Sequence, residues 1–308
     1  MKTKDFISVL DLSPEQAKDL LKKSALAKVD RSMYAGVYNR KVMAMIFEKP
    51  SLRTRVTFET GLYQMGGYSI YLAPGDIRLG VRETVADIAR NLDRWVDIIV
   101  ARTFEHKSVV ELGKYANIPV INALSDLEHP CQAMADFLTL SENFGDVSEI
   151  TLAYVGDGNN VCCSLMLLSA LLGTNFHAAI PDNYHPPVEV VEKAKSIAKE
   201  SGSEIIVDPD PQKMIKDVQG VYTDTWISMG QEEETERRKR IFEKYQVNRE
   251  LFACAASDAI VMHCMPAHRG LEITDEVIDS PQSKVFDQAE NRLHVQKILM
   301  ADLFDRQA

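Results

Sequence analysis

The sequence predicts an α/β protein of two domains, each built on a doubly wound parallel sheet, with an active-site cleft between them. Short β-rich apolar runs alternate with longer segments that favour helix, which is the pattern of βαβ units and a parallel sheet. The alternation continues through all 308 residues, about two domains at roughly 150 residues each. The loop at 144–149 is the best candidate boundary, which gives domains 1–145 and 146–289.

The first half is expected to open with a helix. Ser13 can cap this helix, Pro14 suits its first position and Gln16 completes a capping box, so the helix should run to about Lys28. The elements that follow are strands at 41–47, 68–72, 97–101 and 119–122, alternating with helices that begin near 51, at 83, after 101 and at 131.

The second half repeats this order. The expected strands are 151–155, 176–180, 205–207, 220–223 and 259–262, and the expected helices are 161–172, 187–200 and about 290–304. In the run 231–240, acidic residues stand four positions before basic residues, as in Glu234–Arg238, and such pairs support a solvated helix. We therefore expect no functional residue between 231 and 240.

Composition excludes several classes of protein. The chain has 35 Lys and Arg against 45 Asp and Glu, a net charge of −10, so it lacks the basic surface that nucleic-acid binding requires. Its most apolar run, 161–172, is too short to span a membrane, and its N-terminus lacks the features of a signal peptide. Five cysteines without a C-x-x-C spacing favour reduced thiols over disulfides or a zinc site. We expect a cytoplasmic protein without metal, membrane or nucleic-acid partners.

An anion site is expected where Ser51-Leu52-Arg53-Thr54-Arg55 follows a strand and opens a helix. Backbone N–H groups at a helix start, two hydroxyls and two guanidinium groups suit a phosphate. Arg102 lies just past another strand of this half, at the edge where parallel sheets bind ligands. The alternative is a capping serine followed by surface arginines.

Three further segments carry polar side chains after strands. His129-Pro130-Cys131-Gln132 offers a donor for a carbonyl oxygen, although a loop histidine before a helix-starting proline is the plainer interpretation. Asn159 and Asn160 put amides at the cleft, suited to a carboxylate or amine. Asp224 follows a strand and precedes Ser228-Met229-Gly230, a loop that can take an ammonium group and shield it from water.

Two motifs lie near the C-terminus. In His263-Cys264-Met265-Pro266 the Cys264 thiol follows a strand and is expected to face the cleft, unless it is a buried structural cysteine. Glu290-Asn291-Arg292 opens the terminal helix, from which Arg292 can return to the anion site of the first domain.

Together these motifs resemble the ornithine carbamoyltransferases along essentially the whole chain. S-x-R-T-R, H-P-x-Q, D-x-x-x-S-M-G, H-C-x-P and E-N-R occur in that family's order and spacing. The resemblance implies transfer of the carbamoyl group of carbamoyl phosphate to the δ-amine of L-ornithine, giving L-citrulline and phosphate without a cofactor. It also implies a homotrimer or an assembly of trimers, and a C-terminal helix, 290–308, that packs back on the carbamoyl phosphate domain.

The resemblance carries residue roles over by position. The residues implied to bind carbamoyl phosphate are Ser51, Leu52, Arg53, Thr54, Arg78, Arg102, His129, Pro130, Cys131, Gln132, Cys264, Met265 and Arg292. Those implied to bind ornithine are Asn160, Asp224, Ser228 and Met229. Arg102 and His129 are implied to stabilise an oxyanion, and Asp224 and Cys264 to orient the amine and help remove its proton.

Two positions depart from the family. Arg78 stands where the family usually has Gln. In the family, the side chain at this position reaches the carbamoyl phosphate site of a neighbouring subunit. An arginine there either strengthens anion binding or blocks it. Leu52 stands where many members have Thr or Met, at a position that contributes mainly its backbone.

Two other interpretations stay open. Gly156, Gly158 and Asp182 half-match the fingerprint of an NAD-dependent dehydrogenase, although Val161 replaces the third glycine. A carbamoyltransferase-like binding or regulatory subunit would require a broken catalytic set. The sequence does not decide whether an enzyme of this family makes citrulline or runs in the reverse direction.

Overall fold

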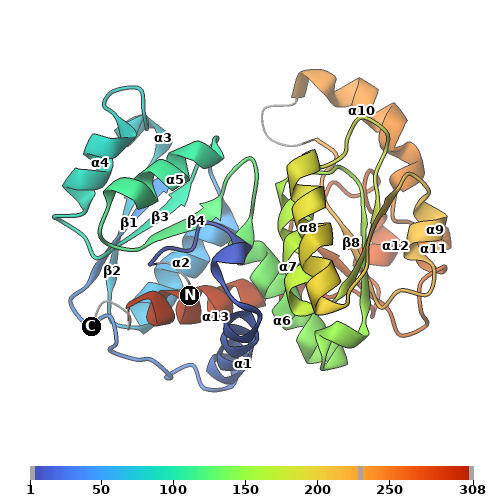
Figure 1. The fold of residues 1–308 in the computed structure, drawn as a ribbon, viewed down its shortest axis with the longest axis horizontal. Helices are drawn as coiled ribbons and strands as arrows, with labels where there is room; N and C mark the ends of the chain where they lie inside the picture. The colour runs from blue at the N-terminus through green and yellow to red at the C-terminus, as the bar shows by residue number, and fades with distance from the viewer. Residues whose placement is uncertain (1–3, 228–231, 305–308) are drawn as a thin grey trace. The chain divides into compact units, whose positions relative to one another are not determined.

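The computed structural model describes residues 4–227 and 232–304, which form two compact units. Unit 1 contains the residues up to Leu138 together with those from Glu290 onward, and unit 2 contains Thr139–Ala289. Each unit is a parallel sheet between layers of helices (Figure 1). The division falls after residue 138, whereas the sequence analysis expected it after residue 145, because α6 (Pro130–Phe144) contributes residues to both units.

The sheet of unit 1 has four parallel strands. Their order is β2 (Tyr68–Leu72), β1 (Val42–Phe47), β3 (Ile98–Arg102), β4 (Val120–Leu124). The chain order reverses between β1 and β3, and their ends are level because Phe47 pairs with Arg102. The loops after these two strands therefore meet at one edge, which is where doubly wound sheets bind ligands.

Helices cover both faces of this sheet. α4 (Val85–Leu92) and α5 (His106–Tyr115) lie on one face, and α2 (Leu52–Gln64) lies on the other (Figure 1). The residues of α13 (Val285–Phe304) from Glu290 onward pack on α2, where a Cβ on Gly61 would come within 3.3 Å of Met300. This packing brings Arg292 into unit 1.

The local signal for the start of the first helix is confirmed. α1 (Pro14–Val29) begins with the expected capping box, since Ser13 accepts from the Gln16 N–H and the Gln16 side chain accepts from the Ser13 N–H. α1 contacts α13 through an ion pair of Lys23 with Asp302 at 3.0 Å. That pair ties the C-terminal helix to the first helix of the chain.

The sheet of unit 2 has five parallel strands. Their order is β7 (Ile205–Asp208), β6 (Asn175–Ala179), β5 (Thr151–Val155), β8 (Gly220–Thr223), β9 (Ile260–His263). α7 (Asn160–Leu172) and α8 (Val188–Ser201) pack against each other along one face (Figure 1). The chain order reverses between β5 and β8, so the loops after these two strands meet at one edge.

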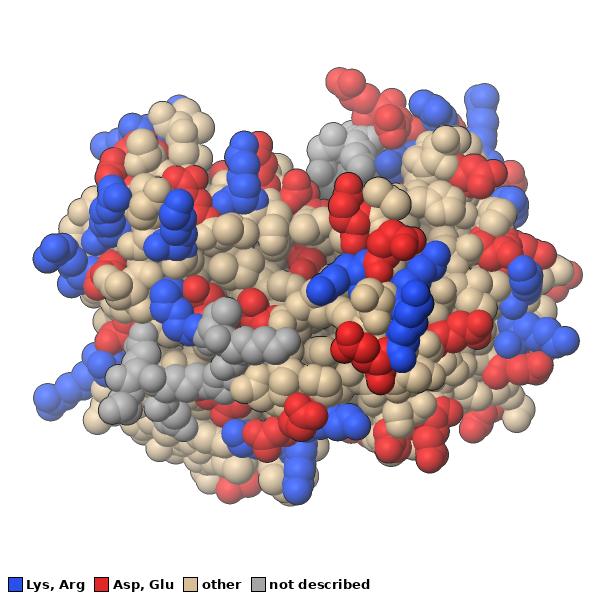
Figure 2. Space-filling view, viewed as in Figure 1, with Lys and Arg blue, Asp and Glu red and all other residues tan. Residues whose placement is uncertain are grey.

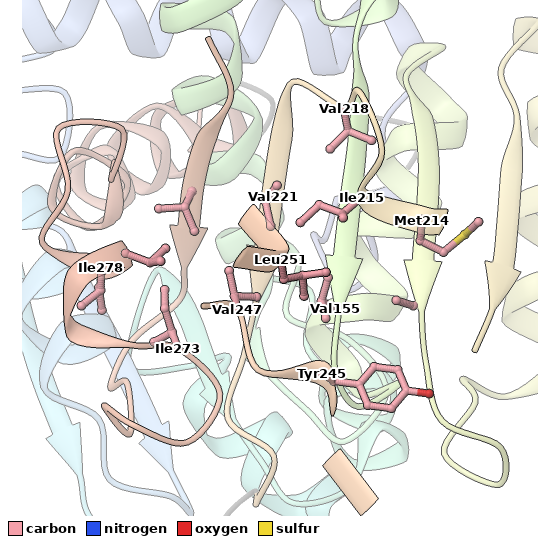
Figure 3. Close-up of a cluster of buried hydrophobic side chains, with 14 of the residues drawn as sticks. Val155, Met214, Ile215, Val218, Val221, Tyr245, Val247, Leu251, Ile273 and Ile278 are labelled. Carbon is pink, nitrogen blue, oxygen red and sulfur yellow. The ribbon is translucent and has the colours of Figure 1, made fainter. Parts of the chain in front are cut away.

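Short helices cover the other face of this sheet: α9 (Pro211–Ile215), α11 (Arg249–Phe252) and α12 (Asp275–Ile278). Figure 3 shows the core beneath them, which joins Val155 and Val221 of the sheet to Met214, Leu251 and Ile278 of these helices. Each fully buried aliphatic side chain contributes about 1.5–3 kcal/mol. Apolar burial therefore holds this layer, because helices of one turn have little stability of their own.

The short elements are the ones that the sequence analysis missed. Four or five residues do not display a helical period, so α3 (Pro74–Ile77), α9, α11 and α12 gave no signal. α13 begins at Val285, before the expected start near Glu290. The remaining elements are 3-10 helices at Val9–Asp11, Val147–Glu149, Glu232–Glu234 and Glu243–Tyr245.

The helix expected within 231–240 is α10 (Thr235–Phe242). Arg238 pairs with Glu234 as expected, at 3.0 Å. However, Arg238 is only 6% exposed, so the expectation of a wholly solvated helix is wrong.

The surface carries charges of both signs. Figure 2 shows acidic and basic side chains interspersed over the face drawn, so the net negative charge is not gathered into one patch there. Among the described residues, no helix combines the length and apolarity needed to cross a membrane.

Candidate active site

The loop after β1 presents the start of α2 to the ligand-binding edge of unit 1. Ser51 caps the helix by accepting from the Thr54 N–H at 3.3 Å, and no acidic residue occupies the first turn. The positive end of the helix dipole is therefore not neutralised within its own turn, which favours an anion. Leu52 is exposed, Arg53 is half-buried and Thr54 is buried.

Arg55 does not join this group. Its guanidinium lies 3.7 Å from the centroid of the Tyr71 ring and pairs with Glu59 at 3.0 Å. The expectation that both guanidinium groups of the motif serve the anion site is therefore wrong, and Arg53 alone remains for that role.

Arg292 lies buried among hydrogen-bond acceptors from α2 and α6. Its guanidinium donates to Oε1 of Gln132 and, at 3.1 Å, to Oγ1 of Thr54. With the Gln296 amide oriented so that its oxygen faces Arg292, that oxygen accepts from Nε at 3.1 Å and from Nη2 at 3.0 Å. The Gln132 amide in turn donates to Asp136 at 2.8 Å. The structure thus brings together Thr54, Gln132 and Arg292, which the sequence analysis took from three separate motifs.

Several cations surround His129. Burial lowers the pKa of His129 well below its ordinary value, and the charges of Arg292, Arg102 and Arg53 lower it further. His129 is therefore neutral near pH 7 and can donate an N–H without carrying net charge. Burial and the charge of Arg102 also lower the pKa of Lys49. The sequence analysis missed this lysine, which lies just before the Ser51 motif. This concentration of positive charge is suited to an anion.

The other residues expected in unit 1 have different environments. Pro130 begins α6, and burial raises the pKa of the Cys131 thiol to about 12, so Cys131 is not a nucleophile near neutral pH. Arg78 follows α3 in the left-handed region, with φ of 44°, and its side chain is exposed. The structure therefore places Arg78 on the surface of unit 1, while the anion-site residues Arg102, His129 and Arg292 are buried.

Asp224 is the centre of a second group, at the edge of unit 2 where β5 and β8 end. Its side chain accepts from Asn159 Nδ2 at 2.7 Å, from the Cys264 thiol at 2.9 Å and from the Thr225 N–H at 2.7 Å. Asn159 also caps α7, because its Oδ1 accepts from the N–H groups of Val161 and Cys162 at 3.0 and 3.1 Å. The amide that holds Asp224 is thus fixed by a helix start.

The loop carrying Cys264 is held by two buried residues, His263 of the H-C-x-P motif and Glu272, which the sequence analysis missed. The Met265 N–H donates to Nδ1 of His263 at 2.9 Å, so Nε2 of His263 carries the hydrogen and donates to Glu272 at 3.2 Å. The backbone N–H of His268 also donates to Glu272. Glu272 and the side chain of His263 are fully buried, and no local sequence pattern marks Glu272 as the partner of His263.

Three side chains of this edge could also serve as metal ligands. Atoms of Asp224, His263 and Cys264 lie within 4.8 Å of one another. In the structure, however, the Cys264 thiol donates to Asp224, and Nδ1 of His263 accepts from a backbone N–H. The atoms that would bind a metal are therefore already engaged in hydrogen bonds.

Two of the expected ornithine residues, Ser228 and Met229, lie outside the described residues. The third, Asn160, is half-buried at the first position of α7. Asp224 is 5% exposed.

The structure argues against a dinucleotide site after β5. A pyrophosphate approaches the second glycine of the fingerprint closely. Here a Cβ on Gly158 would lie 2.4 Å from the Pro186 nitrogen and 2.5 Å from the Tyr184 oxygen, so the chain's own backbone fills that space. Asp182, the expected ribose ligand, has an exposed side chain 4.0 Å from His185.

Comparisons with known proteins agree with this division into two groups. Residues 4–142 match the family model "Aspartate/ornithine carbamoyltransferase, carbamoyl-P binding domain", and residues 148–303 match "Aspartate/ornithine carbamoyltransferase, Asp/Orn binding domain". The anion-site residues before α13 fall in the first match, and Asp224 falls in the second.

Full-length relatives agree with these matches. The ornithine carbamoyltransferase of Thermococcus kodakarensis is 50% identical over 97% of this chain and 95% of its own. The solved ornithine carbamoyltransferase from Pyrococcus furiosus has a TM-score of 0.94 at 46% identity, over 96% of each chain. That from Gloeobacter violaceus has a TM-score of 0.88 at 43% identity, over 97% of this chain and 98% of its own. The chain belongs to the aspartate/ornithine carbamoyltransferase family.

Proposed function

We propose that the protein is an ornithine carbamoyltransferase, which transfers the carbamoyl group of carbamoyl phosphate to the δ-amine of L-ornithine and yields L-citrulline and phosphate. One observation carries the proposal: each sheet has a chemically distinct group of side chains at its switch point. Unit 1 offers buried cations and neutral donors beside a helix start, and unit 2 offers a carboxylate fixed by an amide and a thiol. The first group suits a phosphate and a carbonyl, and the second suits an amine.

The residues of unit 1 take carbamoyl phosphate. Ser51, Arg53, Thr54 and Arg102, with the backbone of Leu52, hold the phosphate through charge-assisted hydrogen bonds and the helix start. At the carbamoyl end the assigned residues are His129, Pro130, Cys131, Gln132 and Arg292. As a neutral donor among arginines, His129 can stabilise the carbonyl oxygen as it becomes an oxyanion.

The residues of unit 2 take ornithine. Asp224, Asn160, Ser228 and Met229 are assigned to its binding. Cys264, whose thiol donates to Asp224, and Met265 are assigned to carbamoyl phosphate. The attacking amine must be neutral, yet an alkylamine has a pKa of about 10.4. Asp224 and Cys264 orient the amine and help remove its proton, which passes to the leaving phosphate or to solvent. The amine attacks carbamoyl phosphate directly, without a carbamoyl-enzyme intermediate, and positioning and electrostatics supply the rate.

The active form is a homotrimer or an assembly of trimers in the cytoplasm, without a metal or organic cofactor. An exposed apolar surface on unit 1 supports the assembly. It consists of Leu52, Val56 and Tyr63 along α2 and Tyr68 and Ile70 on the edge strand β2, with Tyr63 80% and Tyr68 69% exposed. Arg78 lies exposed on the same unit and is assigned to the carbamoyl phosphate site of a neighbouring subunit.

The proposal is tested by separating the two substrates. Arg53→Ala should weaken carbamoyl phosphate binding, measured by titration calorimetry, by about 10- to 150-fold, since a hydrogen bond to a charged group is worth about 1.5–3 kcal/mol. Asp224→Ala should leave that binding within twofold and raise the KM for ornithine. Unchanged carbamoyl phosphate binding in Arg53→Ala would contradict the assignment of the phosphate site.

A further inference from the structure

Arg238 is buried although most of its helix is not. Its side chain is 7% exposed, whereas Arg237 and Arg240 on the same helix are exposed. The guanidinium lies 4.9 Å from the centroid of the Tyr184 ring and 5.9 Å from that of Phe242. A charge in such surroundings is costly unless it is paired and hydrogen-bonded. Its partners therefore indicate what the residue does.

One nitrogen of Arg238 joins two segments of unit 2. Nη1 donates to Oδ2 of Asp157 at 2.8 Å and to the backbone oxygen of Trp226 at 2.9 Å. Asp157 lies in the loop after β5, and Trp226 lies in the segment after β8. Glu234, which accepts from Nε at 3.0 Å, lies four residues earlier, at the end of the 3-10 helix before α10, and is half exposed.

The two joined segments are the ones that hold Asp224. Asn159 lies two residues after Asp157, Asp224 lies two residues before Trp226, and the Asn159 amide donates to Asp224 at 2.7 Å. Arg238 therefore links the two segments on either side of the Asp224 carboxylate, although its own hydrogen bonds go to other residues. Its charge also neutralises Asp157, a 10% exposed carboxylate that would otherwise lie unpaired near Asp224.

We infer that Arg238 and Asp157 are positioning residues that fix Asp224 for ornithine. The inference rests on the proposed function and extends it to a residue pair 81 positions apart that lies outside the residues assigned to either substrate. Because the partners of Arg238 all lie in unit 2, the pair should govern the KM for ornithine and leave that for carbamoyl phosphate unaffected.

The test compares Arg238→Met, Asp157→Asn and the double variant by steady-state kinetics of citrulline formation. Methionine keeps an apolar stem against the two rings but removes the charge. We expect Arg238→Met to raise the KM for ornithine at least tenfold, with the KM for carbamoyl phosphate within twofold of the parent. Arg238→Lys should recover part of the loss, and Arg237→Met, an exposed change on the same helix, should match the parent.

The double variant distinguishes a pair from two separate effects. Each single change already breaks the ion pair, so the KM for ornithine in the double variant should not exceed that of the worse single variant by more than about twofold. A multiplicative increase would overturn the inference, as would equal changes in the KM values of both substrates. If Arg238→Met does not fold, Asp157→Asn, which keeps the shape of the side chain, decides the question by the same criteria.

Amide hydrogen exchange provides a readout that does not depend on catalysis. In Arg238→Met, exchange in peptides covering 156–160 and 224–227 should accelerate at least tenfold, while β6 should keep its parent rate. If the parent makes no citrulline but exchange changes in this way, the proposed function fails and the positioning pair stands. If the parent is active and neither exchange nor the KM for ornithine changes, the positioning pair is refuted.

Discussion

Gly158→Ala should impair ornithine use through the backbone alone. A Cβ at this position would lie 2.4 Å from the Pro186 nitrogen and 2.5 Å from the Tyr184 oxygen, against 3.4–4 Å for ordinary contact. The loop must therefore move by about 1 Å, since neither contact is the flexible end of a side chain. Asn159 follows directly, so its 2.7 Å hydrogen bond to Asp224 should be lost or lengthened.

Two magnitudes follow from this displacement. Overpacking of this kind costs about 1–3 kcal/mol, which lowers Tm by about 2–12 °C at roughly 2–4 °C per kcal/mol. Loss of a hydrogen bond to a carboxylate is worth about 1.5–3 kcal/mol, or about a 10- to 150-fold rise in the KM for ornithine. The KM for carbamoyl phosphate should stay within twofold.

The assay is citrulline formation with each substrate varied in turn, together with a thermal melt. Gly75→Ala is the matched control, because a Cβ on Gly75 would meet nothing within 4 Å and its φ is not positive. A Gly158→Ala protein with parental Tm and parental KM for ornithine would refute the role assigned to this loop.

Three further predictions test other parts of the structure. The folded protein resists protonation of His129, so the unfolding free energy of the parent should fall as pH drops below the ordinary histidine pKa of about 6.5. Denaturant titrations of His129→Gln should show a smaller fall in unfolding free energy between about pH 7 and pH 5 than the parent shows. Identical pH profiles for the two proteins would contradict this. Glu272→Gln weakens the acceptor for His263 and should lower kcat about tenfold while the KM for carbamoyl phosphate stays within twofold; an unchanged kcat would exclude a role for Glu272 in placing Cys264. Tyr63→Glu puts a charge on the exposed apolar surface of unit 1 and should shift sedimentation velocity from trimer toward monomer; Lys18→Glu on α1 is the control, and a trimer as stable as the parent would remove this surface from the interface.

Sequence patterns predicted those features whose cause is local. The capping box at Ser13 and Gln16 needs only four consecutive residues, and the structure reproduces it. Central strands such as β3 and β5 are short apolar runs buried on both faces, so their positions also followed from the sequence. The return of Arg292 to the anion site was raised from the E-N-R motif and supported by the resemblance to a family, although its contact with Thr54 spans 238 positions.

Features that depend on tertiary neighbours were not predictable in this way. Arg55 was assigned to the anion site because it stands beside Arg53, but Tyr71 on the next strand offers its guanidinium a ring. Arg238 resembled a solvated residue because its helix is highly charged, yet Asp157 draws it into the interior of unit 2. In each case a partner distant in sequence determined which way the side chain points.

The most direct test of the account measures transfer of the carbamoyl group from carbamoyl phosphate to an amine by the purified protein. L-ornithine should be supplied in one reaction, with aspartate, putrescine and N-acetylornithine in parallel reactions. The account predicts carbamoylation of ornithine and none of the other three amines. Carbamoylation of a different amine would be consistent with the anion site assigned to unit 1 but would contradict the ornithine assignment of unit 2. Absence of product from all four reactions would contradict the proposed enzyme activity.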